Sequence, residues 1–283
     1  MIGIGVEKLY RKSLIIVLSF IVMISISLIV IVSMTMNNTK GIAVLMYHDF
    51  GYRGNPAVIN KEVFADQMNS LDEHGYNVIS MEQYVDYMEG KIELPKKSVL
   101  ITFDDGYEDF YEIAYPILQQ HQFPATNFVV VKSSDEPNPE YFPHLTWDQM
   151  RELKANGMSI YSHTYDSHIK INEVEDKYPL LANYLDGETS DEYKIRVRED
   201  LEYAHKLLVQ ELGEQANILA FPYGAYSDEL LEVMDEIGID HAFTIKPGIN
   251  DRDGDGLYYR INAGLSALDG ESLVRKIKGF YEK

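Results

Sequence analysis

The chain has 283 residues, of which 46% are hydrophobic, and its formal net charge is −20 at pH 7. That length can bury one sizeable core or two small ones. The strong negative charge argues against a nucleic-acid-binding protein, because phosphate backbones attract basic surfaces. Cysteine is absent, which excludes disulfides, thiolate metal ligands and cysteine nucleophiles.

The N-terminal segment has a different composition from the rest of the chain. Residues 14–33 are almost wholly apolar, and roughly 20 such residues span a bilayer as a helix. Lys8, Arg11 and Lys12 precede this run. The positive-inside rule therefore places the N-terminus in the cytoplasm and the chain after Lys40 outside the cell.

A cleaved signal peptide is the alternative interpretation of the same segment. Its apolar region is usually only about 7–15 residues long and precedes a small-residue cleavage site. The run here is longer, and the "SMTMNNTK" that ends it has no such site. The sequence therefore favours an uncleaved anchor over residues 1–40. We expect a single-pass protein of the cell membrane with an extracellular domain over residues 41–283.

Short apolar runs alternate with helical patterns along that domain. Runs typical of buried strands cover residues 41–47, 76–80, 98–103, 125–131, 158–162, 217–221, 241–245 and 258–263. Helical patterns cover residues 60–75, 81–90, 107–122, 145–157, 190–212, 227–237 and the chain from residue 269.

Repeated β-α units with continuous apolar strands predict a parallel sheet covered by helices. With about seven or eight units and no convincing linker, a (β/α) barrel is favoured over an open sheet, and its active site lies at the carboxyl ends of the strands. The polar stretch at residues 170–192 is expected to be a surface insertion.

Polar side chains follow four of the predicted strands directly. They are His48, Asp104, Asp105, His163, His168 and the Pro-Tyr-Gly turn at 222–224. In a barrel these groups converge on one rim.

The two histidines after the strand 158–162 suggest a metal site. Five helical positions turn through about 500°, so His163 and His168 can share one ion only from a loop. Two imidazoles and one carboxylate form a common catalytic zinc set. The third ligand is then Asp104 or Asp105, which leaves the other carboxylate free as a general base. Alone, "DDG" is most often a turn.

The motifs "TFDDG", "SHTYDSH" and "FPYG" together resemble the first three motifs of the polysaccharide deacetylases, carbohydrate esterase family 4, over residues 41–268. The resemblance implies a distorted (β/α) barrel that uses a divalent metal to remove acetyl groups from sugars. It also implies Asp104 as the base, the backbone N–H of Tyr223 in the oxyanion hole, and three metal ligands: Asp105, His163 and His168.

The chain departs from the main branch of that family at two positions. Ala220 stands where an arginine usually orients the base, and we expect Arg260 in "YRINA" to replace it. The usual late histidine is also missing, since His241 begins a strand at the wrong end of the barrel. His48 in "LMYHDF" lies at the right end, as in the branch that deacetylates poly-β-1,6-N-acetylglucosamine, and on that resemblance it is the general acid.

The sequence as a whole predicts a membrane-anchored, metal-dependent N-deacetylase. Poly-β-1,6-N-acetylglucosamine is the favoured substrate and zinc the favoured metal, with cobalt or nickel as alternatives. Peptidoglycan or chitin oligosaccharides are alternative substrates, and a non-catalytic polysaccharide-binding protein is the alternative class. Tyr47, Tyr107 and Tyr165 flank the motifs and are candidate platforms for sugar rings.

Overall fold

The computed structural model describes most of the chain after residue 40. The described residues are Val17, Met23, Ile24, 41–51, 58–140, 142–171 and 178–282. Apart from three residues, the expected anchor over 1–40 lies outside them. Within the described part, none of the helices has the length and apolarity needed to cross a bilayer.

Ten strands form one twisted sheet. They are β1 (Ile42–Tyr47), β2 (Asn77–Ile79), β3 (Ser98–Phe103), β4 (Thr126–Val129), β5 (Ser159–Ser162), β8 (Ile218–Ala220), β9 (His241–Phe243), β10 (Ile249–Asn250), β11 (Leu257–Tyr258) and β12 (Ile261–Asn262). The main path runs β10-β1-β3-β4-β5-β8-β9-β11. All neighbours on it are parallel except β10 and β1.

The segment from β11 to β12 links the two ends of this path. Strand β11 pairs with β9 at one end, and β12 pairs with β1 near the other. Only Tyr259 and Arg260 separate β11 from β12. The sheet is therefore a nearly closed, barrel-like α/β fold, as the alternation of strands and helices predicted.

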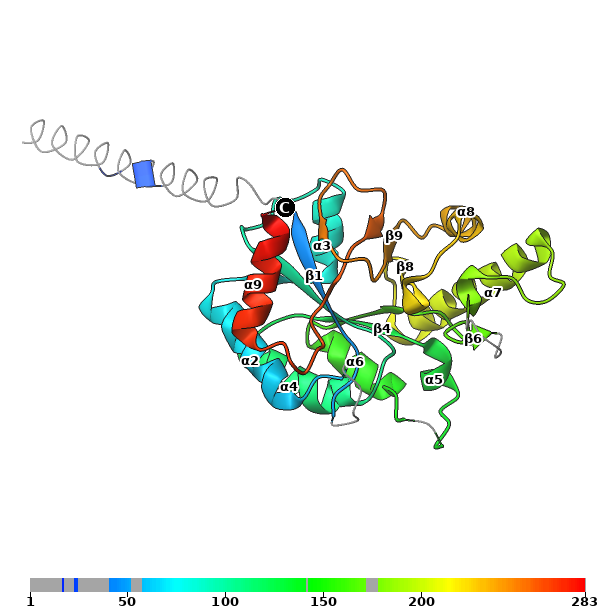
Figure 1. The fold of residues 1–283 in the computed structure, drawn as a ribbon, viewed down its shortest axis with the longest axis horizontal. Coiled ribbons are helices and arrows are strands. Elements are labelled where there is room, and N and C mark those ends of the chain that lie inside the picture. The colour runs from blue at the N-terminus through cyan, green and yellow to red at the C-terminus, as the bar shows by residue number, and fades with distance from the viewer. Residues whose placement is uncertain are drawn as a thin grey trace, which may run out of the picture.

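Helices surround the sheet, most of them on its outer face. They are α2 (Lys61–Glu73), α3 (Met81–Met88), α4 (Tyr115–His121), α5 (Val131–Asp135), α6 (Trp147–Ala155), α7 (Ser190–Leu212), α8 (Asp228–Glu236) and α9 (Gly270–Tyr281). In Figure 1, α2, α4, α6 and α9 lie along one side of β1 and β4, and α7 and α8 lie beyond β8. The insertion at 170–192 holds the short strands β6 (Lys170–Ile171) and β7 (Tyr178–Pro179) and a 3-10 turn (Leu180–Ala182).

Two expected elements differ in detail from the structure. The helix expected over 107–122 is a π-helical turn (Phe110–Ala114) followed by α4. Pro116 has no N–H to continue the i→i−4 ladder, and the preceding Tyr115 N–H donates to the Phe110 carbonyl, five residues back. The strand expected over 125–131 ends at Val129, because α5 begins at Val131.

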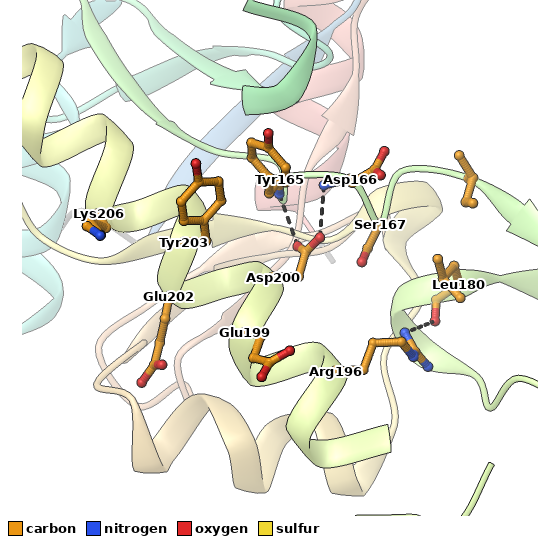
Figure 2. Close-up of a pocket in the computed structure, with 11 residues that line it drawn as sticks. Tyr165, Asp166, Ser167, Leu180, Arg196, Glu199, Asp200, Glu202, Tyr203 and Lys206 are labelled. Atoms are coloured by element: carbon orange, nitrogen blue, oxygen red, sulfur yellow. Dashed lines mark hydrogen bonds between the residues drawn. The ribbon is translucent and has the colours of Figure 1, made fainter. Parts of the chain in front are cut away.

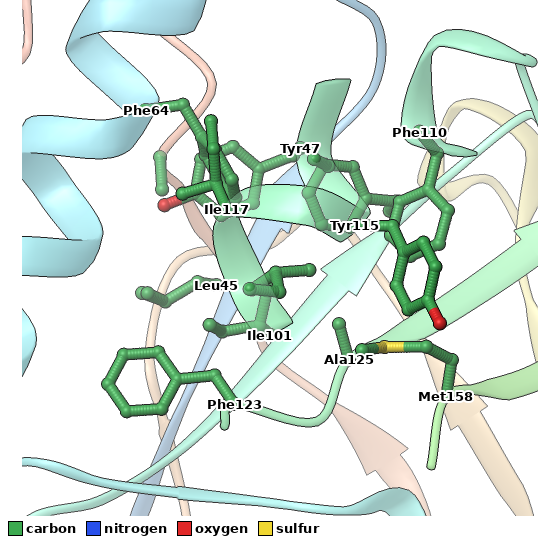
Figure 3. Close-up of a cluster of buried hydrophobic side chains, with 14 of the residues drawn as sticks. Leu45, Tyr47, Phe64, Ile101, Phe110, Tyr115, Ile117, Phe123, Ala125 and Met158 are labelled. Atoms are coloured by element: carbon green, nitrogen blue, oxygen red, sulfur yellow. The ribbon is translucent and has the colours of Figure 1, made fainter. Parts of the chain in front are cut away.

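The alternation of side chains along the strands separates two layers of core. Outward residues such as Leu45 and Ile101 pack with Phe64 of α2 and Phe110, as Figure 3 shows. Tyr47 belongs to this outer layer. It is 0% exposed, and its hydroxyl donates to Gln67. The prediction of Tyr47 as a sugar platform is therefore wrong.

The inner layer fills the barrel. Its members are alternate residues of the strands, among them Val44, Leu100, Phe128, Phe243 and Tyr258, with Met81, Tyr84 and Tyr87 of α3. This packing leaves the carboxyl ends of the strands for polar groups.

Candidate active site

The two aspartates of "TFDDG" stand at a sharp turn after β3. The Asp104 N–H still donates to the Tyr47 carbonyl, 3.0 Å away, as a continuation of the sheet. Asp105 and Gly106 then adopt φ values of 74° and 79°, a left-handed conformation that aspartate tolerates and glycine favours. A Cβ on Gly106 would lie 2.9 Å from Val129 Cγ1. This turn separates the surroundings of the two carboxylates.

Asp104 faces the interior of the barrel and is held by Arg260. The guanidinium donates to both carboxylate oxygens, at 2.6 and 2.7 Å, and both side chains are buried. The Nε of Arg260 donates to the Thr244 carbonyl at 2.8 Å, which fixes the fork itself. Burial alone would raise the pKa of Asp104, but Arg260 and nearby histidines outweigh it, so the pKa lies below its ordinary value. Asp104 is therefore an oriented, ionised carboxylate.

Asp105 faces two histidines instead. Its Oδ1 lies 3.5 Å from Nε2 of His163 and 3.2 Å from Nε2 of His168. One ligand atom from each of the three residues lies within 4.8 Å of the others. His163 follows β5 and His168 lies on the loop after it, so the predicted loop geometry is confirmed.

These three side chains fit a divalent metal. Asp105 Oδ1 is buried and faces the ring nitrogens of His163 and His168, so a cation shared by the three groups would neutralise the buried carboxylate. Burial lowers the pKa of His163 to about 4, so its imidazole is neutral, the form that ligates metals. His163 Nδ1 lies 2.8 Å from the Ala220 carbonyl, and this contact directs Nε2 toward Asp105.

His48 and Tyr223 complete the rim. Nε2 of His48 lies 3.9 Å from Asp104 Oδ2, and its side chain is partly exposed. Tyr223 has φ 58° and ψ 12° inside the Pro222–Gly224 turn. Its ring centroid lies 4.8 Å from that of His168, and the residue is 38% exposed. The structure thus brings all the predicted site residues to one end of the barrel.

His241 lies elsewhere, as predicted. It begins β9, and its Nδ1 lies 2.7 Å from the Tyr258 hydroxyl and its Nε2 3.6 Å from Glu89, just after α3. It belongs to the opposite end of the barrel.

His144 is a residue that the sequence reasoning missed. Its ring centroid lies 4.9 Å from that of Tyr107, and the charges of Asp105 and His168 reach it. Burial lowers the pKa of His144. The segment reaches the rim because Leu145 N–H donates to the Gly106 carbonyl at 2.8 Å. His144 does not directly follow a strand. The search for polar residues at strand ends therefore could not find it.

Comparisons with known proteins agree with this geometry. The family model described as polysaccharide deacetylase matches residues 91–242. The chain is 31% identical over 239 residues to the YxkH protein of Bacillus subtilis (strain 168), covering 83% of this chain and 76% of that protein. It is also 31% identical over 212 residues to the poly-β-1,6-N-acetyl-D-glucosamine N-deacetylase of Escherichia coli (strain K12), covering 68% of this chain and 31% of that longer protein.

Solved structures have the same fold. IcaB from Ammonifex degensii superposes with a TM-score of 0.73 at 26% identity, covering 86% of this chain and 97% of that one. A de-N-acetylase from Aggregatibacter actinomycetemcomitans gives a TM-score of 0.73 at 28% identity, covering 84% and 99%. The chain is therefore an enzyme of the polysaccharide deacetylase family.

Proposed function

We propose that this enzyme is a metal-dependent N-deacetylase of an N-acetylglucosamine polymer, with poly-β-1,6-N-acetylglucosamine as the favoured substrate. One observation carries the proposal. Two adjacent carboxylates have separate partners: Arg260 grips Asp104, while Asp105 faces His163 and His168. That separation is what a hydrolase needs when one carboxylate ligates a cation and the other moves a proton.

The proposed ligands are Asp105, His163 and His168. A divalent metal held there supplies Lewis-acid polarisation and a more acidic water. Zinc suits two imidazoles and a carboxylate, and cobalt or nickel can use the same ligands.

The remaining residues handle the proton and the charge. Asp104 accepts a proton from the attacking water, and Arg260 keeps the carboxylate ionised and oriented. The Tyr223 N–H, in the first turn of a short helix where N–H groups lack intrahelical partners, donates to the developing oxyanion. His48, 3.9 Å from Asp104, gives a proton to the leaving amine.

The name of one relative supports the choice of polymer, and the charge of the chain supports N-deacetylation in general. The Escherichia coli relative bears the name of a poly-β-1,6-N-acetyl-D-glucosamine N-deacetylase. The chain is also strongly acidic, at −20, and deacetylation converts neutral acetamides into amines, so an anionic enzyme attracts its own product. Intact ligands and an intact base argue against a non-catalytic binding protein.

Acetate release by the purified full-length protein tests this proposal. The substrates are poly-β-1,6-N-acetylglucosamine, chitin oligosaccharides and peptidoglycan, each with and without a chelator, and zinc, cobalt or nickel is then added back. We expect the fastest release from the first polymer, abolished by chelation and restored by metal. Full activity in the chelator would contradict the metal dependence. Faster release from chitin or peptidoglycan would refute the proposed substrate and assign that polymer instead.

Residues 1–40 are proposed to anchor the domain at the outer face of the cell membrane, on the composition of the sequence alone. Mass spectrometry of the native protein tests this. An intact N-terminus in the membrane fraction is expected, and a mature chain that begins near residue 40 would refute the anchor.

A further inference from the structure

The loop that joins His163 to His168 contains a strained residue. Thr164 has φ 77°, a left-handed conformation that β-branched residues rarely adopt. Its hydroxyl is buried and has no hydrogen-bond partner among the described residues. Such a conformation persists only where the surrounding structure holds it, so this loop depends on anchors outside itself.

Helix α5 holds one side of the loop. Val131 N–H donates to the Thr164 carbonyl at 3.0 Å, and Lys132 N–H donates to the Tyr165 carbonyl at 3.1 Å. The Lys132 ammonium also pairs with Asp166 at 2.6 Å. In these contacts α5 binds two carbonyl groups and one side chain of the loop. The N–H groups of Tyr165 and Asp166 have a different partner.

That partner is Asp200, in the middle of α7. Its Oδ1 accepts from the Tyr165 N–H at 3.0 Å, and its Oδ2 accepts from the Asp166 N–H at 2.8 Å. The Ser167 hydroxyl is a third hydrogen-bond partner. Figure 2 shows the Asp200 carboxylate directed from α7 at the loop. Aspartate is a poor residue for a helix interior, so its place here reflects this contact.

We propose that Asp200 is a positioning residue that fixes the separation of His163 and His168 and thereby sets the metal affinity of the site, an inference that rests on the metal-dependent function proposed above. Asp200 binds the backbone two and three residues before His168, while β5 fixes His163. Without Asp200, the Tyr165 and Asp166 N–H groups before the second histidine lose their carboxylate partner. Partners that orient ligands in this indirect way typically change metal affinity by about 10–100-fold.

The neighbouring acids of α7 provide matched controls. Glu202 also lines the groove of about 670 Å³ beside the loop, but Figure 2 shows its carboxylate pointing away from the loop. The Glu202→Gln variant therefore removes the same charge as Asp200→Asn without touching the loop. Because the groove is open, water can take up the freed N–H groups of Tyr165 and Asp166, so the Asp200 variants are expected to fold.

The test measures metal binding by the purified full-length protein. Zinc and cobalt are titrated in competition with a chromophoric chelator, and the visible spectrum of bound cobalt reports the ligand geometry. We expect Asp200→Ala to bind about 10–100-fold more weakly with an altered cobalt spectrum, Asp200→Asn to be intermediate, and Glu202→Gln to stay within twofold of wild type. The unfolding temperatures of the metal-free proteins check the fold.

Several outcomes would overturn the inference. Wild-type metal affinity and an unchanged cobalt spectrum in Asp200→Ala would do so. If the alanine variant fails to fold, the same two results in Asp200→Asn would overturn the inference. Wild-type protein that binds neither metal would refute the proposed metal dependence instead. Hydrogen exchange at Tyr165 and Asp166 then decides the positioning role, since anchoring by Asp200 requires faster exchange in Asp200→Asn than in Glu202→Gln.

Discussion

Replacing Arg260 by lysine keeps a positive charge beside Asp104 but removes the planar fork that binds both of its oxygens. The wild-type contacts are 2.6 and 2.7 Å long, and a third donor group of Arg260 binds the Thr244 carbonyl. A lysine ammonium is a single point of charge and cannot reproduce this geometry. The variant therefore separates the charge of Arg260 from its orienting role.

The structure sets the size of the effect on stability. Both side chains are buried, Arg260 at 0% and Asp104 at 3% exposure. Removing one partner of such a pair outright costs about 3–5 kcal/mol. Lysine keeps the charge but loses one charge-assisted hydrogen bond to Asp104 and the donor to the Thr244 carbonyl, so the cost should also be about 3–5 kcal/mol. For a domain of this size, that lowers the melting temperature by about 6–20 °C.

The substitution is expected to affect catalysis as well as stability. A general base contributes about 10²–10⁴ to the rate, so a mis-oriented Asp104 lowers kcat by about 10²-fold or more. KM should change little, since Arg260 is fully buried. Arg260 also lowers the pKa of Asp104. The base must be ionised, so a weaker contact raises this pKa and moves the acid limb of kcat/KM to higher pH.

Acetate release at saturating metal and thermal unfolding together measure these effects. Arg252→Lys is the matched control, because Arg252 binds the Tyr87 carbonyl and Glu93, both at 2.7 Å, away from the rim. It should lose some stability and keep kcat. The reasoning is refuted if Arg260→Lys loses stability but keeps wild-type kcat and an unmoved acid limb, since Arg260 would then serve only to hold the barrel together.

Four further substitutions test other parts of the site. Asp104→Asn should retain bound metal but lose about 10²–10⁴-fold in kcat, and metal analysis beside acetate release checks both; near-normal turnover would exclude Asp104 as the base. His163→Ala should lose bound metal, which equilibrium dialysis measures, and stoichiometric binding would remove it from the ligand set. His48→Gln should lower kcat by about 10²-fold without changing metal content, and an unchanged kcat assigns the acid elsewhere. Gly224→Ala places a Cβ 2.9 Å from the Ile245 backbone N at φ +68°, so it should destabilise the protein by about 1–3 kcal/mol in thermal unfolding; a neutral effect would show that the turn can relax.

The strand ends were the most predictable part of the site. Apolar runs of strand length place Asp104, Asp105, His163 and His168 at the carboxyl ends of β3 and β5, and a parallel barrel brings those ends together. This prediction needs no knowledge of long-range contacts. It uses only the position of a residue along a strand and does not tell which face of the sheet the side chain lies on. Tyr47 stands beside His48 in sequence, but its side chain faces the helices and is buried.

Contacts between distant parts of the chain were harder to predict. Arg260 and Asp104 are 156 residues apart, and they meet because the chain crosses from β11 to β12 where the barrel nearly closes. His144 arrives through backbone pairing between loops, which leaves no periodic signal. Asp200 looks in the sequence like one more solvated charge on a long acidic helix. In each case the role of the residue depends on the residue that it contacts. That contact exists only once the sheet has nearly closed.

The same dependence explains why two like-charged residues can stand side by side in "TFDDG". Two carboxylates at a strand end repel unless each has its own cationic or hydrogen-bonding partner. The left-handed turn at Asp105 directs one toward two histidines and leaves the other facing Arg260. Position in the motif therefore does not by itself distinguish the two aspartates. The chain crossing between β11 and β12 does, because it brings Arg260 to Asp104, and on the proposed mechanism this contact makes Asp104 the carboxylate that accepts the proton.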